Sequence, residues 1–138
     1  MASFNKFYCF VEDLAEKKHN LGSDTLTVAL CAAANPPSLS NTVLANLTQI
    51  SYTNLSSRVL STVSSSQTTG TYKLVVSDLV LTASGGAVAA FRYIVIYNDT
   101  AANDELIGYY DYGSDLTLAD GESLTLDFNA TNGLLQLT

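Results

Sequence analysis

The spacing of hydrophobic positions changes near Gly22, which divides the chain into a short first part and a long second part. In the first part apolar residues recur three or four positions apart, as on the buried face of an amphipathic helix. Lys17, Lys18 and His19 suit the negative end of a helix dipole, and Gly22 is a suitable stop. The spacing predicts one helix over about residues 4–18, with apolar positions at Phe4, Phe7, Tyr8, Val11, Leu14 and Ala15.

Beyond Gly22 apolar residues alternate with polar or small ones, which is the period of a β-strand. In residues 25–31 the alternation of Leu26, Val28 and Leu30 predicts a half-buried strand. Similar runs follow, separated by segments rich in Gly, Ser, Asn and Asp that are typical of turns. The further strands that we expect are 58–64, 71–82, 90–98, 105–112, 123–128 and 134–138.

These elements together predict the fold class. A chain of 138 residues is long enough for one domain whose core needs no disulfide or metal. Many short strands behind one helix are typical of layered β proteins. We therefore expect a mainly β, single-domain antiparallel β-sandwich or jelly-roll-like fold over residues 1–138, with one N-terminal amphipathic helix. A surface loop over about 34–57, rich in Ser, Thr and Asn, interrupts it.

A hairpin is expected where residues 92–97 and 106–110 flank the sequence NDTAANDE. Its tip, 98–105, contains Asp99, Asn103, Asp104 and Glu105, whose oxygens are of the kind that Ca²⁺ prefers. The spacing matches no EF-hand loop, and Asn and Asp side chains commonly hydrogen-bond to their own turn. We favour the self-stabilised turn over a calcium site.

Composition and charge exclude several classes of partner. Six basic residues against thirteen acidic ones give a net charge of −7, which opposes binding to nucleic acid. No run of eighteen apolar residues suggests a membrane span, and the N-terminus has no export signal, so we expect synthesis in the cytosol. Cys9 and Cys31 lie in apolar contexts, and in that compartment we interpret them as buried thiols rather than a disulfide.

Candidate catalytic chemistry is sparse. A catalytic triad would need His19, the one histidine, which stands at the expected helix end where a structural role is common. Neither a Gly-x-Ser-x-Gly sequence nor a phosphate-binding loop occurs. Two separated cysteines and one histidine do not have the spacing of a zinc site, and without tryptophan a sugar-cleaving pair of carboxylates is weakly supported. We expect no enzyme activity, no catalytic residues, no metal and no cofactor.

The surface is expected to be poor in charge, since only 14% of residues are charged, against roughly 25% in an ordinary globular protein. Such a surface is typical of proteins that neighbours partly cover. Contacts with other subunits are therefore expected at aromatic and apolar residues of the helix and the hairpin, although the hairpin tyrosines could instead belong to a core between sheets. These residues are Phe4, Phe7, Tyr8, Val11, Tyr93, Tyr97, Tyr109, Tyr110 and Tyr112.

Several phrases of the chain resemble a group of small virion proteins of tailed bacteriophages. In order they are HNLGSDTLTVAL, SSSQTTGTYKLVVSDLVLTASGG, FRYIVIYNDTAANDELIGYYDYG, LADGESLTLDF and TNGLLQLT, within residues 17–138. The resemblance implies a non-enzymatic structural protein, most like a capsid cement, or decoration, protein. Such proteins commonly form homotrimers that clamp major capsid subunits.

The resemblance thus implies self-association and the major capsid protein as partners, with neither nucleic acid nor membrane. It places the chain on the capsid surface of the virion, after synthesis in the cytoplasm of a bacterial host. A tail or neck protein at the head-to-tail connection is the alternative within the virion. A virion-borne module that binds host-surface sugars, expected to show a tyrosine-lined groove, and a hydrolase are alternatives of other classes.

Overall fold

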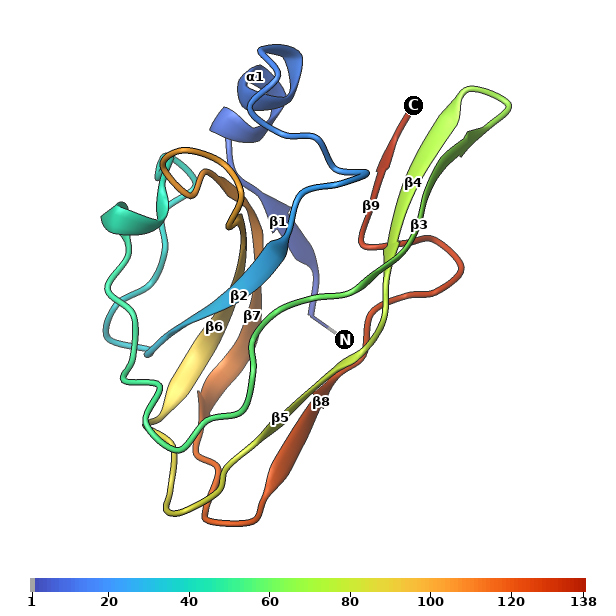
Figure 1. Ribbon diagram of the computed structural model, residues 1–138. Helices are drawn as coiled ribbons and strands as arrows, with labels where there is room; N and C mark the ends of the chain where they lie inside the picture. The colour runs from blue at the N-terminus through green and yellow to red at the C-terminus, as the bar shows by residue number, and fades with distance from the viewer. Residues whose placement is uncertain (1) are drawn as a thin grey trace.

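Four antiparallel strands in the order β1–β7–β6–β2 form the central sheet, as the computed structural model of the chain shows for residues 2–138 (Figure 1). The long hairpin of β6 and β7 lies in the middle of this sheet. The N-terminal strands flank it, because β1 pairs with β7 and β2 pairs with β6. The strands are β1 (Phe4–Lys6), β2 (Leu26–Cys31), β6 (Phe91–Asn98) and β7 (Leu106–Leu116).

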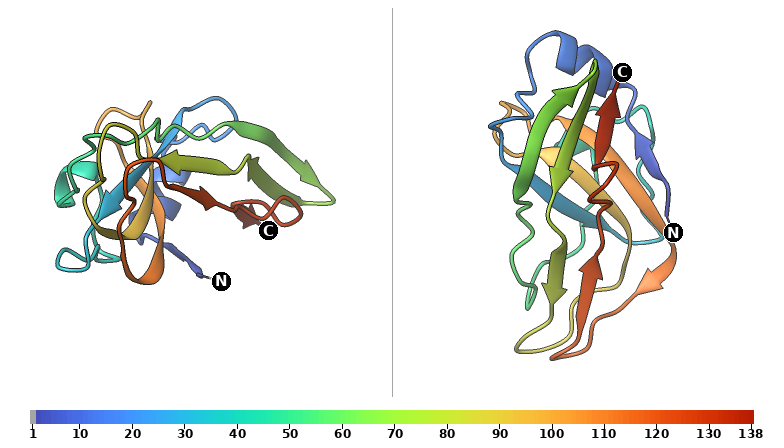
Figure 2. Two further views of the ribbon diagram at one scale, coloured as in Figure 1. Left: turned by 90° about the horizontal axis from the view of Figure 1, so that it is seen from below. Right: turned by 90° about the vertical axis from the view of Figure 1, so that its right-hand side faces the viewer.

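A second layer, here called the outer ribbon, covers one face of the central sheet (Figures 1 and 2). It consists of a three-stranded sheet in the order β3–β4–β9 and the strand pair β5–β8, and the chain runs from β4 to β5 and from β8 to β9. The strands are β3 (Thr62–Thr68), β4 (Thr71–Val76), β5 (Leu79–Thr82), β8 (Ser123–Leu126) and β9 (Leu135–Leu137). The predicted mainly β antiparallel fold is confirmed, with 42% strand and 7% helix.

The main hydrophobic core lies between the two layers. Val28 and Ile96 of the central sheet meet Leu74 and Leu126 of the outer ribbon there. The opposite face of the central sheet is covered as well, because Phe7, Leu44 and Leu47 pack on it with Val95 and Tyr97. Side chains on both faces of this sheet are therefore shielded from water.

This double cover corrects the prediction for β2. The alternation in residues 25–31 indicated a half-buried strand, but all six residues of β2 are buried. Ala29 and Cys31 face the second cover rather than solvent, and Thr27 is buried with its hydroxyl bonded to Asp99. The outer edge of β2 is also occupied, because the backbone N–H of Val28 donates to the carbonyl of Arg58 at 2.9 Å.

The predicted helix over 4–18 is only partly correct. Residues 4–6 form β1, and the helix, α1, spans Cys9–Ala15. Pairing with β7 fixes residues 4–6 as a strand, a tertiary contact that overrides local spacing. Beyond its last residue, Ala15, the chain leaves the helical path at Lys17, which has the left-handed conformation (φ 66°), and the N–H of Lys18 donates to the carbonyl of Asp13. Gly22 is not its stop.

Other elements also differ from the prediction, and β7 extends beyond the expected residue 112 to Leu116. The expected strand 71–82 is two strands, β4 and β5, because Asp78 leaves the ladder and accepts a hydrogen bond from the N–H of Phe128 at 2.9 Å. The expected strand 58–64 begins instead at Thr62, and residues 58–60 lie along β2. The loop over 34–57 contains one short 3-10 helix, Leu44–Asn46.

Gly108 of β7 allows β1 to pack closely, which makes it a sensitive position. A Cβ atom there would collide with the ring of Phe4 and lie 2.9 Å from the carbonyl oxygen of Asn5. We expect Gly108→Ala to lower the free energy of unfolding by about 1–3 kcal/mol, the usual range for overpacking. Urea unfolding would measure it. Gly22→Ala is the control, since its nearest contact is the flexible Ser65 hydroxyl at 3.3 Å, and an equal loss in both variants would contradict the expectation.

Candidate functional site

The tip of the hairpin between β6 and β7 is organised by one buried side chain, Asn98, which is 0% exposed. Its Oδ1 accepts hydrogen bonds from the backbone N–H groups of Thr100 and Ala101, at 3.0 and 3.1 Å. This fixes the orientation of the amide, so that Nδ2 is the donor. The Nδ2 group donates to Oδ2 of Asp24 at 2.6 Å and to Nδ1 of His19 at 3.0 Å.

The orientation of Asn98 determines the state of His19. Because Nδ1 accepts from Asn98, the ring proton must be on Nε2, and a proton on Nδ1 would face the hydrogens of the amide. His19 is 5% exposed and packs against Phe10, with ring centroids 5.4 Å apart. Burial lowers the pKa of His19, against the opposing influence of the acids Asp13, Glu105 and Asp24. The ring is a neutral structural group whose Nδ1 is bonded to an amide rather than to a nucleophile.

The acidic residues of the tip also bond mainly to their own surroundings. Glu105 accepts from the backbone N–H and the side-chain amide of Asn103, at 3.2 and 3.4 Å. Asp99 accepts from the hydroxyl of Thr27 at 3.2 Å. The prediction that tip side chains bond to the backbone of their own turn is confirmed for Asn98 and Glu105, whereas Asp99 bonds to β2. Among residues 2–138, no cluster of three His, Cys, Asp or Glu side chains is placed to hold a metal.

Both cysteines are free thiols, as the sequence indicated, but only Cys31 is fully buried as expected. Cys31 is buried in the central sheet and Cys9 is half-buried at the start of α1. Burial raises the pKa of each to about 11, so neither is a thiolate at neutral pH. These sulfur atoms are packing groups.

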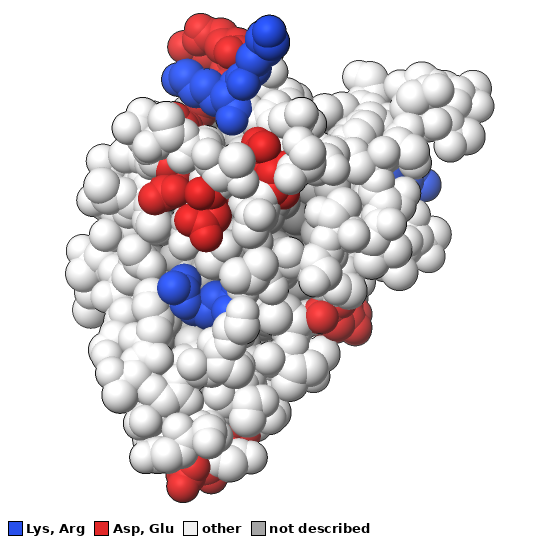
Figure 3. Space-filling model, viewed as in Figure 1, with Lys and Arg blue, Asp and Glu red and all other residues white. Residues whose placement is uncertain are grey.

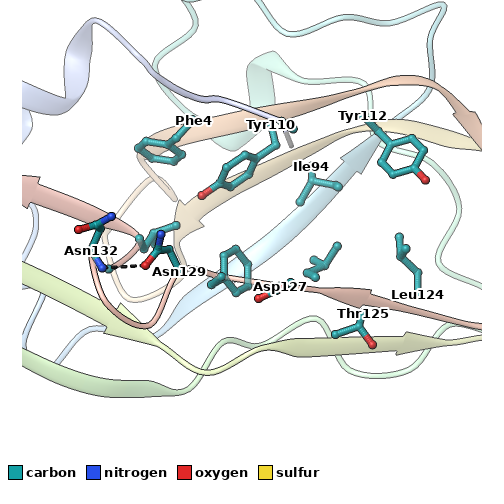
Figure 4. A pocket seen from close by; sticks show the side chains of 14 residues that line it. Phe4, Ile94, Tyr110, Tyr112, Leu124, Thr125, Asp127, Asn129 and Asn132 are labelled. Carbon is teal, nitrogen blue, oxygen red and sulfur yellow. Dashed lines mark hydrogen bonds between the residues drawn. The ribbon is translucent and has the colours of Figure 1, made fainter.

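The surface feature best suited to binding is an apolar hollow at the open edge of the sandwich, here called the edge hollow (Figure 4). It lies where the central sheet and the outer ribbon are not joined, and its volume is about 320 Å³. Its walls are mostly apolar or aromatic, with polar groups from the segment that joins β8 to β9. The lining residues that matter here are Phe4, Ile94, Tyr110, Tyr112, Leu124, Phe128, Asn129 and Asn132.

Aromatic rings from both walls line the edge hollow. The ring of Tyr110 is 5.3 Å from that of Phe4 and 6.2 Å from that of Phe128, measured between centroids. Burial raises the pKa of Tyr110 to about 12, so its hydroxyl stays protonated and can donate a hydrogen bond. In Figure 4 this hydroxyl points into the space between β7 and the segment with Asn129. The hollow can hold an apolar group that carries a hydrogen-bond acceptor.

The structure gathers only some of the predicted contact residues at this site. Phe4, Tyr110 and Tyr112 line the edge hollow, and Tyr112 is 49% exposed. Tyr8 and Val11 are exposed instead at α1, where Tyr8 is 67% exposed. The helix and the hairpin thus present two separate surfaces rather than one.

Four predicted contact residues are in or against the second hydrophobic cluster. Phe7, Tyr93 and Tyr97 are buried there, and Tyr109 is half-buried against them. Assigning the first three to contacts with other subunits was wrong, because the covering of the second sheet face removes them from the surface.

Sequence reasoning missed the other wall of the edge hollow, which comes from the C-terminal part of the chain. Leu124, Leu126 and Phe128 alternate with polar residues, a strand signal that marks one apolar face. The alternation reveals that face but not which sheet lies opposite it.

The state of His19 gives an expectation for pH. A pKa lowered by folding means that the neutral ring is favoured in the folded state, so the stabilisation is present above about pH 6.5 and is lost as the pH falls through the folded-state pKa. Urea unfolding at a series of pH values would measure how the free energy of unfolding depends on pH. His19→Gln keeps an acceptor for Asn98 but does not titrate, so its free energy of unfolding should fall less between pH 7.5 and 5; equal falls would contradict the expectation.

No protein-family model matches the chain, and no curated protein or solved structure is significantly similar to it. Within residues 2–138, no helix has the length and apolar character needed to cross a membrane.

Proposed function

We propose that the chain is a non-enzymatic structural protein of a phage virion, a capsid cement or decoration protein that binds between major capsid subunits and stabilises the head. The sequence phrases that resemble small virion proteins supply the biological setting. The edge hollow is the observation that favours a binding role, because it is an open, apolar site formed without any reactive pair of side chains.

The size and lining of the edge hollow suit part of a protein partner. A volume of about 320 Å³ is at the small end of ligand pockets, and its apolar wall is continuous with the exposed ring of Tyr112. Buried aromatic anchors of this kind contribute much of the affinity of protein interfaces. We propose that an apolar side chain of a capsid subunit enters the hollow and that Tyr112 packs over it.

Cementing follows from such a contact by mass action. A protein that binds the assembled shell but not its separated subunits stabilises the shell by RT ln(1 + [L]/Kd) for each site. One modest contact for each chain is sufficient when many sites are occupied on the same shell. No covalent chemistry is required.

Co-sedimentation with expanded, undecorated heads of the phage that encodes the chain would test the proposal. We expect saturable pelleting of the wild-type protein and an increase of about tenfold or more in Kd for Tyr112→Ser, the usual effect of removing an interface anchor. Tyr112 is 49% exposed, so its truncation leaves the core intact.

Tyr8→Ser is the matched control, because it is the same substitution at another exposed tyrosine. Loss of binding in Tyr8→Ser alone would move the capsid contact from the edge hollow to α1. A wild-type protein that leaves heads bare but pellets with purified tails would replace the cement proposal with the tail or neck alternative.

A further inference from the structure

The strand β3 leaves one edge of the outer ribbon unpaired. It is the first strand in the order β3–β4–β9, and the β3–β4 hairpin projects beyond the central sheet (Figure 1). The free edge is the longest in the ribbon, with seven residues, Thr62–Thr68. An exposed edge strand presents unpaired N–H and C=O groups that another strand can bind.

The turn of this hairpin identifies which backbone groups point outward. Thr69 and Gly70 both have positive φ, 50° and 82°, as in the type I′ turn that connects the strands of a hairpin with a two-residue loop. Thr68 and Thr71 are then the closing hydrogen-bonded pair, and such pairs alternate along an antiparallel ladder. The N–H and C=O groups of Ser65 and Gln67 therefore point away from β4.

The edge lacks the features by which strands usually avoid association. No charged residue or proline occurs from residue 59 to 72, although the chain carries a net charge of −7. Figure 3 shows the outer end of the hairpin free of charge on the face in view. A bulge lies only at the start, between Thr62 and Ser64, and leaves Ser64–Thr68 regular.

We propose that β3 pairs antiparallel with β3 of a second copy of this chain. The two outer ribbons then form one continuous six-stranded sheet about a two-fold axis. A second copy is the occupant that the charge distribution favours, because two chains of net charge −7 repel each other least where neither carries charge. The edge is also self-complementary, since cross-strand pairs of Ser and Thr are favourable.

The pairing does not depend on the proposed capsid role, and it has a definite stoichiometry. An isologous contact uses the same edge of both copies and closes at two. The trimer implied by the resemblance would require two different surfaces on each chain. The mass of the free protein therefore distinguishes the two assemblies, whether or not the protein binds heads.

Light scattering across a concentration series of the purified full chain would test the pairing. We expect the mass to approach twice the 14.7 kDa of one chain as the concentration rises. Gln67→Pro removes one outward N–H from each copy but no hydrogen bond to β4, so two inter-chain bonds are lost. The dimer dissociation constant should rise about tenfold or more.

Gln67→Ala is the matched control. Both variants lose the side-chain oxygen that accepts from the N–H of Gly70 at 3.1 Å, but the alanine variant keeps the outward N–H. Its dissociation constant should stay near that of the wild type. Equal melting temperatures of the two variants, measured below the dimer concentration range, would show that the proline variant keeps the hairpin folded.

Ser66→Glu provides an independent variant. Ser66 is exposed and stands opposite Lys73 in the β3–β4 register, so a glutamate there gains a cross-strand partner within its own chain. In the dimer it adds a like charge to the paired edge of each copy, and we expect dissociation that added salt partly reverses. A wild-type chain that stays monomeric, a trimer, or a dimer unaffected by both Gln67→Pro and Ser66→Glu would overturn the proposal.

Discussion

The structure depends on burying both faces of the central sheet. All residues of β6 except Arg92 are buried, with Ile94 and Ile96 on one face and Tyr93, Val95 and Tyr97 on the other. Such a strand is stable only when two layers exclude water from it. The outer ribbon supplies one layer. The other comes from Phe7 and the loop that carries Leu44 and Leu47, so this long loop without regular strands is part of the fold.

The buried amide of Asn98 joins the β6–β7 hairpin to the segment between α1 and β2. It links the end of β6 to His19 and Asp24, which lie between α1 and β2, and Thr25 donates its N–H to the Thr100 hydroxyl at 2.8 Å. The amide of Asn98 satisfies groups that would otherwise be buried without a partner, which is costly, whereas Nε2 of His19 is buried without one within residues 2–138. The acidic tip is thus held from inside by neutral and charge-assisted hydrogen bonds.

The strand period and the turn residues were sufficient to predict the β6–β7 hairpin and the fold class, because both are local signals. The N-terminal segment was predicted wrongly from the same kind of local signal. Phe4 and Phe7 fit a helical spacing, yet pairing with Gly108–Tyr110 of β7 makes residues 4–6 a strand. The edge hollow could not be predicted, since it joins Phe4, Tyr110 and Leu124, which only the tertiary fold brings together. Alternation marks an apolar face but does not reveal what lies against it.

The two surfaces proposed for association lie on opposite edges of the outer ribbon. β3 is at one edge of the order β3–β4–β9, whereas the edge hollow adjoins β8 and the segment that leads into β9. Pairing through β3 therefore leaves the hollow of each copy open. A two-fold pair would present two hollows at a fixed separation, and the second would bind at an effective concentration set by the first. Self-association and partner binding then reinforce each other, because a rigid sheet rather than a flexible linker connects the two sites.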